Sequence, residues 1–97
     1  MNTVFEALAH PIRREILEML KDDSRNAGDI ASAFAITKPT LSVHLAKLRE
    51  AGLIRSERRG NAIIYSINLS VIEDVMLGFI GRLGATTPRT QTIQKGV

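Results

Sequence analysis

The stretch from residue 28 to residue 53 reads GDIASAFAITKPTLSVHLAKLREAGL, and its pattern decides the fold. A short segment with apolar spacing leads into the turn Ala35-Ile36-Thr37, and a longer helical segment follows. Thr37 is a favourable N-cap, Pro39 falls in the first turn where proline is tolerated, and Gly52 is the expected terminator. A short helix, a tight turn with an apolar anchor and a longer helix together predict a helix-turn-helix.

The longer of these helices, expected to run to about Ala51, has two different faces. Leu41, Leu45 and Leu48 recur at helical spacing and predict the face that packs on the core. The opposite face carries short side chains in its first two turns, whereas an ordinary solvent face carries mostly long charged ones. Short side chains let a helix approach base edges in the major groove. We therefore expect DNA contacts from Thr37, Lys38, Pro39, Thr40, Ser42, Val43 and Lys47.

The two histidines of the chain have different expected uses. His44 lies on the shoulder of the longer helix, roughly 60° from the leucine stripe at about 100° per residue. A packed histidine and a phosphate-binding one both remain open for His44, and we place it in the expected DNA-contact set. His10 precedes Pro11 at a helix junction and is expected to cap the following helix. Two histidines without cysteine make a poor metal site, so we expect no metal and no cofactor.

A basic hairpin is expected directly after the helix-turn-helix. Two strand-like runs, residues 53–57 and 62–67, flank the sequence RRGN at residues 58–61. Gly60 and Asn61 both accept positive φ, which favours a β-hairpin. A basic hairpin tip alone is usually a solvated turn, but arginines beside a recognition helix can enter a minor groove or bind phosphate. We expect DNA contacts here from Arg55, Arg58, Arg59 and Asn61.

Two helices are expected before the helix-turn-helix. The first runs over about residues 3–9, with Thr3 and Glu6 spaced as a capping box. Pro11 suits the first position of the second helix. Arg13 and Arg14 of that helix are expected to pair with Glu18 or Glu6, with contact to backbone phosphate as the alternative. The third helix, which belongs to the helix-turn-helix, is expected to be capped by Asn26.

A last helix is expected through about Leu83, opened by a capping box of Ser70 and Glu73. Its apolar residues span an arc that is too wide for one buried stripe and needs two surfaces to pack against. The apolar arc comprises Val71, Ile72, Val75, Met76, Phe79, Ile80 and Leu83. The whole order, four helices, a hairpin and a helix, is mainly α with one β-hairpin, in the α+β class, over residues 1–83. Residues 84–97 are polar and without period, and they are expected to be a disordered tail.

Composition and charge narrow the class of protein. The 97 residues make one domain, and the absence of cysteine excludes disulfides, thiolate metal sites and cysteine nucleophiles. No apolar run approaches the ~18 residues of a membrane span. The N-terminus lacks the pattern of a signal peptide, so a cytoplasmic location without membrane insertion is expected. Residues 37–61 hold six basic and two acidic side chains, against a whole-chain charge of +3. This asymmetry favours a polyanion-binding face, with a solvated basic surface as the alternative.

Several motifs, in this order and spacing, resemble the ArsR/SmtB family of winged-helix repressors. The resemblance covers about residues 2–83, and residues 37–39 and the start of the chain resemble its metal-free, SdpR-like autorepressor branch. The motifs are AHPIRREIL at 9–17, AGDIA at 27–31, TLSVHL at 40–45, LREAGLI at 48–54, and RGN at 59–61 leading to IYS at 64–66.

The resemblance implies a winged helix-turn-helix homodimer joined through the first and last helices. One dimer would place two recognition helices about one DNA turn apart, over a near-palindromic operator. Repression then follows from occupation of a promoter, which in this family is often the regulator's own. The interface residues that the resemblance implies are Val4, Phe5, Leu8, Val71, Val75, Met76, Phe79, Ile80 and Leu83.

The chain departs from the metal-sensing members of that family. They use cysteines in the third helix, or paired histidines and carboxylates on the last helix. Here residues 27–32 read AGDIAS and the last helix has no histidine, so no metal-sensing site is expected. A small-molecule inducer, a sequestering protein partner and autoregulation by concentration alone all remain open.

Three other functions are weaker alternatives. A winged-helix module that binds an acidic protein partner fits the basic face, but protein interfaces favour aromatic residues over small hydroxyl-bearing ones. An RNA-binding role would need a stacking platform, and the chain has one tyrosine and three phenylalanines. An enzyme is disfavoured because no titratable pair has the spacing of a nucleophile and its base.

Overall fold

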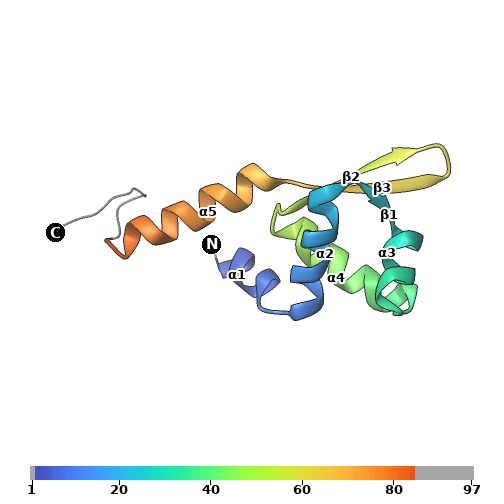
Figure 1. The fold of residues 1–97 in the computed structure, drawn as a ribbon, viewed down its shortest axis with the longest axis horizontal. Helices are drawn as coiled ribbons and strands as arrows, with labels where there is room; N and C mark the ends of the chain where they lie inside the picture. The colour runs from blue at the N-terminus through green and yellow to red at the C-terminus, as the bar shows by residue number, and fades with distance from the viewer. Residues whose placement is uncertain (1, 85–97) are drawn as a thin grey trace.

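The computed structural model describes residues 2–84, shown in Figure 1. The fold is the predicted winged helix-turn-helix of the α+β class, with one short strand more than expected. The predicted disordered tail falls mostly on residues 85–97, which lie outside the described residues. The elements are α1 (Asn2–Leu8), α2 (Pro11–Asp22), β1 (Arg25–Asn26), α3 (Ala27–Phe34), α4 (Lys38–Glu50), β2 (Ile54–Arg59), β3 (Ala62–Ile67) and α5 (Leu69–Arg82).

The core lies between the helices α2, α3 and α4 and the base of the hairpin. Leu41, Leu45 and Leu48 of α4 are buried, which confirms the predicted leucine stripe. The buried side chains of the other elements meet them in one cluster. This cluster includes Ile16, Leu17, Leu20, Ile30, Ala31, Leu53, Ile54 and Tyr65.

The ends of α4 are fixed by local hydrogen bonds of the predicted kind. Thr37 is the N-cap, and its Oγ1 accepts a hydrogen bond from the Thr40 amide at 3.3 Å. At the other end the Leu53 amide donates to the Leu48 carbonyl at 3.0 Å, and Gly52 has φ 78°. This is a Schellman motif, in which glycine supplies the left-handed residue at no steric cost. The helix is therefore held in register at both ends.

The sheet has three antiparallel strands in the order β1-β3-β2. The extra strand β1 is only two polar residues long and has no alternation that sequence could reveal. In the hairpin, Gly60 has φ 61°, and among the described non-glycine residues only Ala35 has a positive φ. Positive φ at the first of the two loop residues alone is the pattern of a type II′ turn.

Both predicted capping boxes are wrong. Helix α1 already includes Asn2, so Thr3 lies inside the helix. Helix α5 starts at Leu69 with Asn68 as N-cap residue and no side-chain cap bond. The Asn68 amide donates to the Leu53 carbonyl at 2.8 Å, and its side chain donates to the Gly52 carbonyl at 3.2 Å. A tertiary anchor on the α4–β2 loop therefore sets where α5 begins.

The junction between α1 and α2 is made by two arginines that bond to backbone. Arg13 donates to the carbonyls of Ala7 and Glu6 at 2.8 and 3.1 Å, and Arg14 donates to that of Leu8 at 2.6 Å. These carbonyls belong to the last turn of α1, where positive charge is favourable. The predicted ion pairs with Glu6 or Glu18 do not form within residues 2–84. His10 is the N-cap of α2, as predicted.

Helix α5 runs away from the body of the protein, with α1 beside it in Figure 1. Val71, Ile72 and Val75 pack against the core cluster. Further along, Phe79 meets Phe5 of α1 edge to face, with ring centroids 5.2 Å apart. None of the described helices is long and apolar enough to cross a membrane.

Candidate nucleic-acid interface

The side of α4 that faces away from the core is exposed and carries mostly short side chains in its first two turns. We call it the outer face. Val43 is 58% exposed, although β-branched apolar side chains are usually covered. Such a methyl-bearing group beside hydroxyls matches the chemistry of base edges, where a thymine methyl lies next to donors and acceptors. The outer face comprises Thr37, Lys38, Pro39, Thr40, Ser42, Val43 and Lys47, all exposed.

Two threonines at the start of α4 are held in a defined orientation. The Thr37 hydroxyl accepts from the Thr40 amide and donates to Thr40 Oγ1 at 3.0 Å. Thr40 Oγ1 therefore accepts from Thr37 and keeps its own proton for an outside acceptor. The cap thus presents one pre-oriented hydroxyl donor on the outer face.

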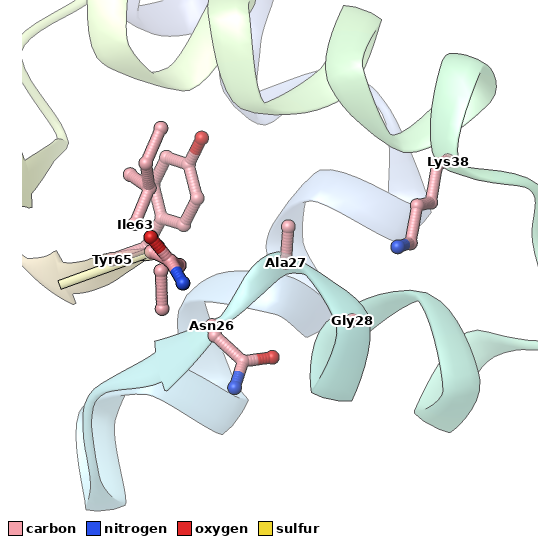
Figure 2. Close-up of a pocket in the computed structure, with 8 residues that line it drawn as sticks. Asn26, Ala27, Gly28, Lys38, Ile63 and Tyr65 are labelled. Atoms are coloured by element: carbon pink, nitrogen blue, oxygen red, sulfur yellow. The ribbon is translucent and has the colours of Figure 1, made fainter. Parts of the chain in front are cut away.

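An open groove separates the start of α4 from the hairpin, which is the wing of this fold. Its volume is about 370 Å³. Figure 2 shows Lys38 projecting from the start of α4 toward the space between the two sides, with Ile63 and Tyr65 opposite. Asn26, the N-cap residue of α3, and Gly28 in its first turn line the groove from a third side. Asn61 lines it from the turn of the wing. The one charged side chain in this lining is a cation, Lys38, which suits a polyanion.

The wing arginines divide between the two faces of the hairpin. Directly opposed residues of an antiparallel pair share a face. Ile63 and Tyr65, two residues apart on β3, share the face that Figure 2 shows opposite Lys38, and Arg58 pairs with Ile63, so Arg58 lies on that face of the hairpin. Arg55 pairs with Ser66 and lies on the other face, because its position alternates with that of Arg58. The same alternation places Arg59 on the face of Arg55. The sequence alone did not assign the three arginines to different faces.

Arg59 is partly neutralised where it stands. Its Nη2 lies 3.2 Å from Glu57 Oε1, and both side chains are about two-thirds exposed, at 68% and 67%. An ion pair this exposed is screened by water and salt and contributes little to stability. The guanidinium therefore remains available to an outside anion, with Glu57 as a competing charge.

His44 does not lie on the outer face. It is 8% exposed, and its Nδ1 lies 3.3 Å from Arg13 Nη1. Its ring centroid is 4.6 Å from that of His10. Burial, with smaller contributions from His10 and Arg13, lowers the pKa of His44. The packed alternative is the one the structure supports, so we leave His44 out of the proposed contact set.

The residues expected at the dimer interface differ in their exposure within one protomer, from buried to largely exposed. Val4 is already 6% exposed within one protomer, and Phe5, Leu8, Val71, Val75 and Met76 are half-buried. Phe79, Ile80 and Leu83 are exposed at 40%, 38% and 69%. Sequence reasoning passed over two further exposed leucines on α5, Leu69 before the assumed start of the helix and Leu77 outside the apolar arc. The second half of α5 thus leaves an apolar surface uncovered.

The fold and the outer face define a DNA-binding regulator of the winged helix-turn-helix class, and comparison with known proteins agrees. Residues 10–56 match the family model described as bacterial regulatory protein, arsR family. The transcriptional repressor SdpR of Bacillus subtilis (strain 168) is 46% identical over 85 residues, which cover 84% of this chain and 94% of that repressor. The chain belongs to the ArsR family of transcriptional regulators, so it is not an enzyme.

Solved structures lead to the same family. The crystal structure of the ArsR family transcriptional regulator RHA00566 superposes with a TM-score of 0.77 at 26% identity, over 92% of each chain. Rv0081 of Mycobacterium tuberculosis superposes with a TM-score of 0.63 at 36% identity, over 84% of this chain and 89% of that one. The predicted resemblance to the ArsR family is confirmed.

Proposed function

We propose that this protein is a homodimeric repressor that binds a near-palindromic operator with the outer face of α4 in the major groove. The observation that carries the proposal is the exposed start of α4, with small hydroxyl and methyl groups beside a basic wing. Similarity to a protein described as a transcriptional repressor supports the direction of regulation.

On the outer face the proposed roles follow side-chain chemistry. Thr40 and Ser42 donate or accept hydrogen bonds at base edges, and Val43 contacts a thymine methyl. Lys38 and Lys47 bind phosphate or guanine, because an ammonium group donates to either. Thr37 and Pro39 set the approach of the helix, the first through its hydrogen bonds to Thr40.

The groove and the wing are proposed to bind the sugar-phosphate backbone. A strand that leaves the major groove at the start of α4 would pass Lys38, cross the groove and meet Asn61. Arg58 lies on the groove side of the hairpin and is the wing residue we expect to contact DNA most closely. Arg55 and Arg59 add positive charge from the other face. These contacts fix position and contribute affinity without reading sequence.

The dimer is proposed to form through α1 and the exposed half of α5. Large contiguous apolar patches are uncommon on monomers, and Phe79 and Ile80 of α5 are exposed together with its C-cap residue Leu83. A second copy that packs on this surface supplies the second boundary that the wide apolar arc of α5 requires. Two copies related by a two-fold axis then present two α4 helices to two half-sites.

We propose that release from DNA does not use the family's metal ligands. The chain has no cysteine and α5 has no histidine, so the donor sets expected for those sensors are missing. Among residues 2–84 no three of His, Cys, Asp and Glu lie close enough together to hold a metal. The signal would then be a small molecule, a protein partner or the concentration of the repressor itself.

Fluorescence anisotropy with two labelled duplexes tests the proposal. One is the DNA upstream of the protein's own coding sequence, and the other is the same bases in shuffled order. We expect the natural duplex to bind at least 10³-fold more tightly, with affinity falling steeply as salt rises. Equal affinity for the two duplexes would contradict sequence-specific repression of its own gene.

A further inference from the structure

Arg13 touches both the end of α1 and the middle of α4. From α2 its guanidinium donates to the Ala7 and Glu6 carbonyls, and the same group lies 3.3 Å from His44 Nδ1. Helix α4 packs directly against α1 and α2 as well. One side chain therefore connects a helix of the proposed dimer interface with the helix of the proposed DNA contact.

The chemistry of this contact requires a neutral histidine. Arginine has only donors, so His44 Nδ1 must be the acceptor and carry no proton. Neutral His44 then holds its proton on Nε2. His10 Nδ1 is also an acceptor, because it receives the Ile12 amide at 3.3 Å as the N-cap of α2.

We propose that Arg13 is a positioning residue that holds α4 relative to α1 through neutral His44, and that protonation of His44 breaks this contact and weakens operator binding. The inference rests on the proposed function. A proton on Nδ1 removes the acceptor and sets an imidazolium against a guanidinium. Both changes push the two side chains apart.

Within residues 2–84, no negatively charged side chain acts on His44 to offset the added charge. The charged or titratable groups that face it are Arg13 from α2 and His10 at the N-cap of α2. Helix α1 presents the carbonyls of Glu6 and Ala7 to Arg13, and these are already bonded. From α3 and β2, which also pack on α4, no charged group within residues 2–84 faces His44. Burial and these neighbours hold its pKa below the usual value.

The sign of the effect separates this inference from the alternative of a phosphate-binding histidine. A histidine that binds phosphate gains a charge in acid, so DNA binding strengthens as pH falls. If His44 must instead be neutral to hold α4, DNA binding weakens as pH falls. Histidine is the side chain whose ordinary pKa lies between pH 5.5 and 7.5, and the chain has only two. A change in DNA binding over this range can therefore be assigned by a histidine variant.

The test measures the Kd of wild type and of His44→Asn for the upstream duplex of the anisotropy experiment, at pH 7.5 and at pH 5.5. The Asn Oδ1 occupies nearly the position of His Nδ1 and accepts from Arg13 at both pH values. We expect wild type to weaken roughly three- to fivefold at pH 5.5, which is less than the tenfold limit for one unit of pKa shift linked to binding because the lowered pKa leaves His44 only partly protonated there. His44→Asn should change much less. Stronger or unchanged wild-type binding in acid, or an equal loss in His44→Asn, would overturn the inference.

Two further variants address the role of Arg13. Arg13→Gln can still donate one hydrogen bond but cannot span α1 and α4, so we expect weaker binding at pH 7.5 and a smaller pH effect. Arg14→Gln is the matched control, because Arg14 bonds only to the Leu8 carbonyl of α1 among the hydrogen bonds described, and it should keep the wild-type pH profile. A normal pH profile in Arg13→Gln would contradict the positioning role.

Urea unfolding at the same two pH values separates failure of this inference from failure of the proposed function. The unfolded chain takes up the proton on His44 more readily than the folded one, so stability falls as pH drops below about 6.5. We expect a smaller fall in His44→Asn than in wild type. This readout needs no DNA. If specific DNA binding is absent at pH 7.5 but the stability of wild type still falls more than that of His44→Asn, the repressor proposal fails and the proton-sensitive contact is a structural feature only. If the stability of both proteins falls equally, the contact itself is refuted.

Discussion

At the scale of single residues, the helix ends follow from sequence and the long-range contacts do not. Thr37 and Gly52 were predictable because a cap depends on the few residues beside it. The Arg13–His44 contact was not, since it joins positions 31 apart in the chain. The sequence left a packed His44 open as an alternative, but only the fold shows which guanidinium lies against it.

Ala35 has a backbone conformation that is unfavourable for a residue with a Cβ atom. It ends α3 with φ 54° and ψ 39°, the left-handed region that glycine adopts without penalty. Its side chain is exposed, so removal loses little packing. We expect Ala35→Gly to raise the free energy of unfolding by about 0.5–1 kcal/mol in urea denaturation. Ala33→Gly is the control, because Ala33 is exposed inside α3 and glycine there should destabilise by a similar amount; a destabilised Ala35→Gly would contradict the strain.

At the scale of elements, periodicity predicted the helices and the hairpin but neither β1 nor the faces of the wing. A two-residue strand has no period, and β1 exists because Arg25 and Asn26 pair with Tyr65 and Ile64 of β3. The division of the wing arginines depends on the register of β2 against β3, which a count along the sequence does not supply.

The register leads to a prediction about the wing. Arg58→Ala should weaken binding to operator and shuffled DNA alike and lower the salt slope by about one, as for the loss of one phosphate contact. Arg55→Ala, on the other face, is the matched control and should have a clearly smaller effect. Anisotropy titrations over a salt series measure both. A larger loss in Arg55→Ala would show that DNA approaches the opposite face of the hairpin.

At the scale of the whole molecule, the width of the apolar arc on α5 indicated a second partner surface, and the protomer leaves part of it exposed. The sequence did not show how the arc divides. Val71, Ile72 and Val75 pack within the protomer, whereas Leu83 is 69% exposed near the end of α5. The packing within one protomer is needed to see which apolar residues remain exposed for a second copy.

A charge on that surface should therefore prevent the proposed dimer from forming. We expect Leu83→Asp to weaken dimerisation at least roughly tenfold in sedimentation velocity, because an unpaired carboxylate would be buried against apolar groups. Leu77→Asp is the matched control, since Leu77 is 51% exposed and lies outside the apolar arc. An intact dimer in Leu83→Asp, or monomers in Leu77→Asp, would mean that the interface lies elsewhere. Helix content from circular dichroism checks that each variant remains folded.

The most direct test of the central claim is selection of bound duplexes from a random DNA library, followed by sequencing. If two α4 helices of one dimer contact DNA, the selected sites should hold two inverted half-sites with centres about 10–10.5 base pairs apart. A Ser42→Ala protein should select a changed base at the same position in both half-sites. A single unrepeated motif, or no enriched motif at all, would contradict a dimeric repressor that reads sequence through α4.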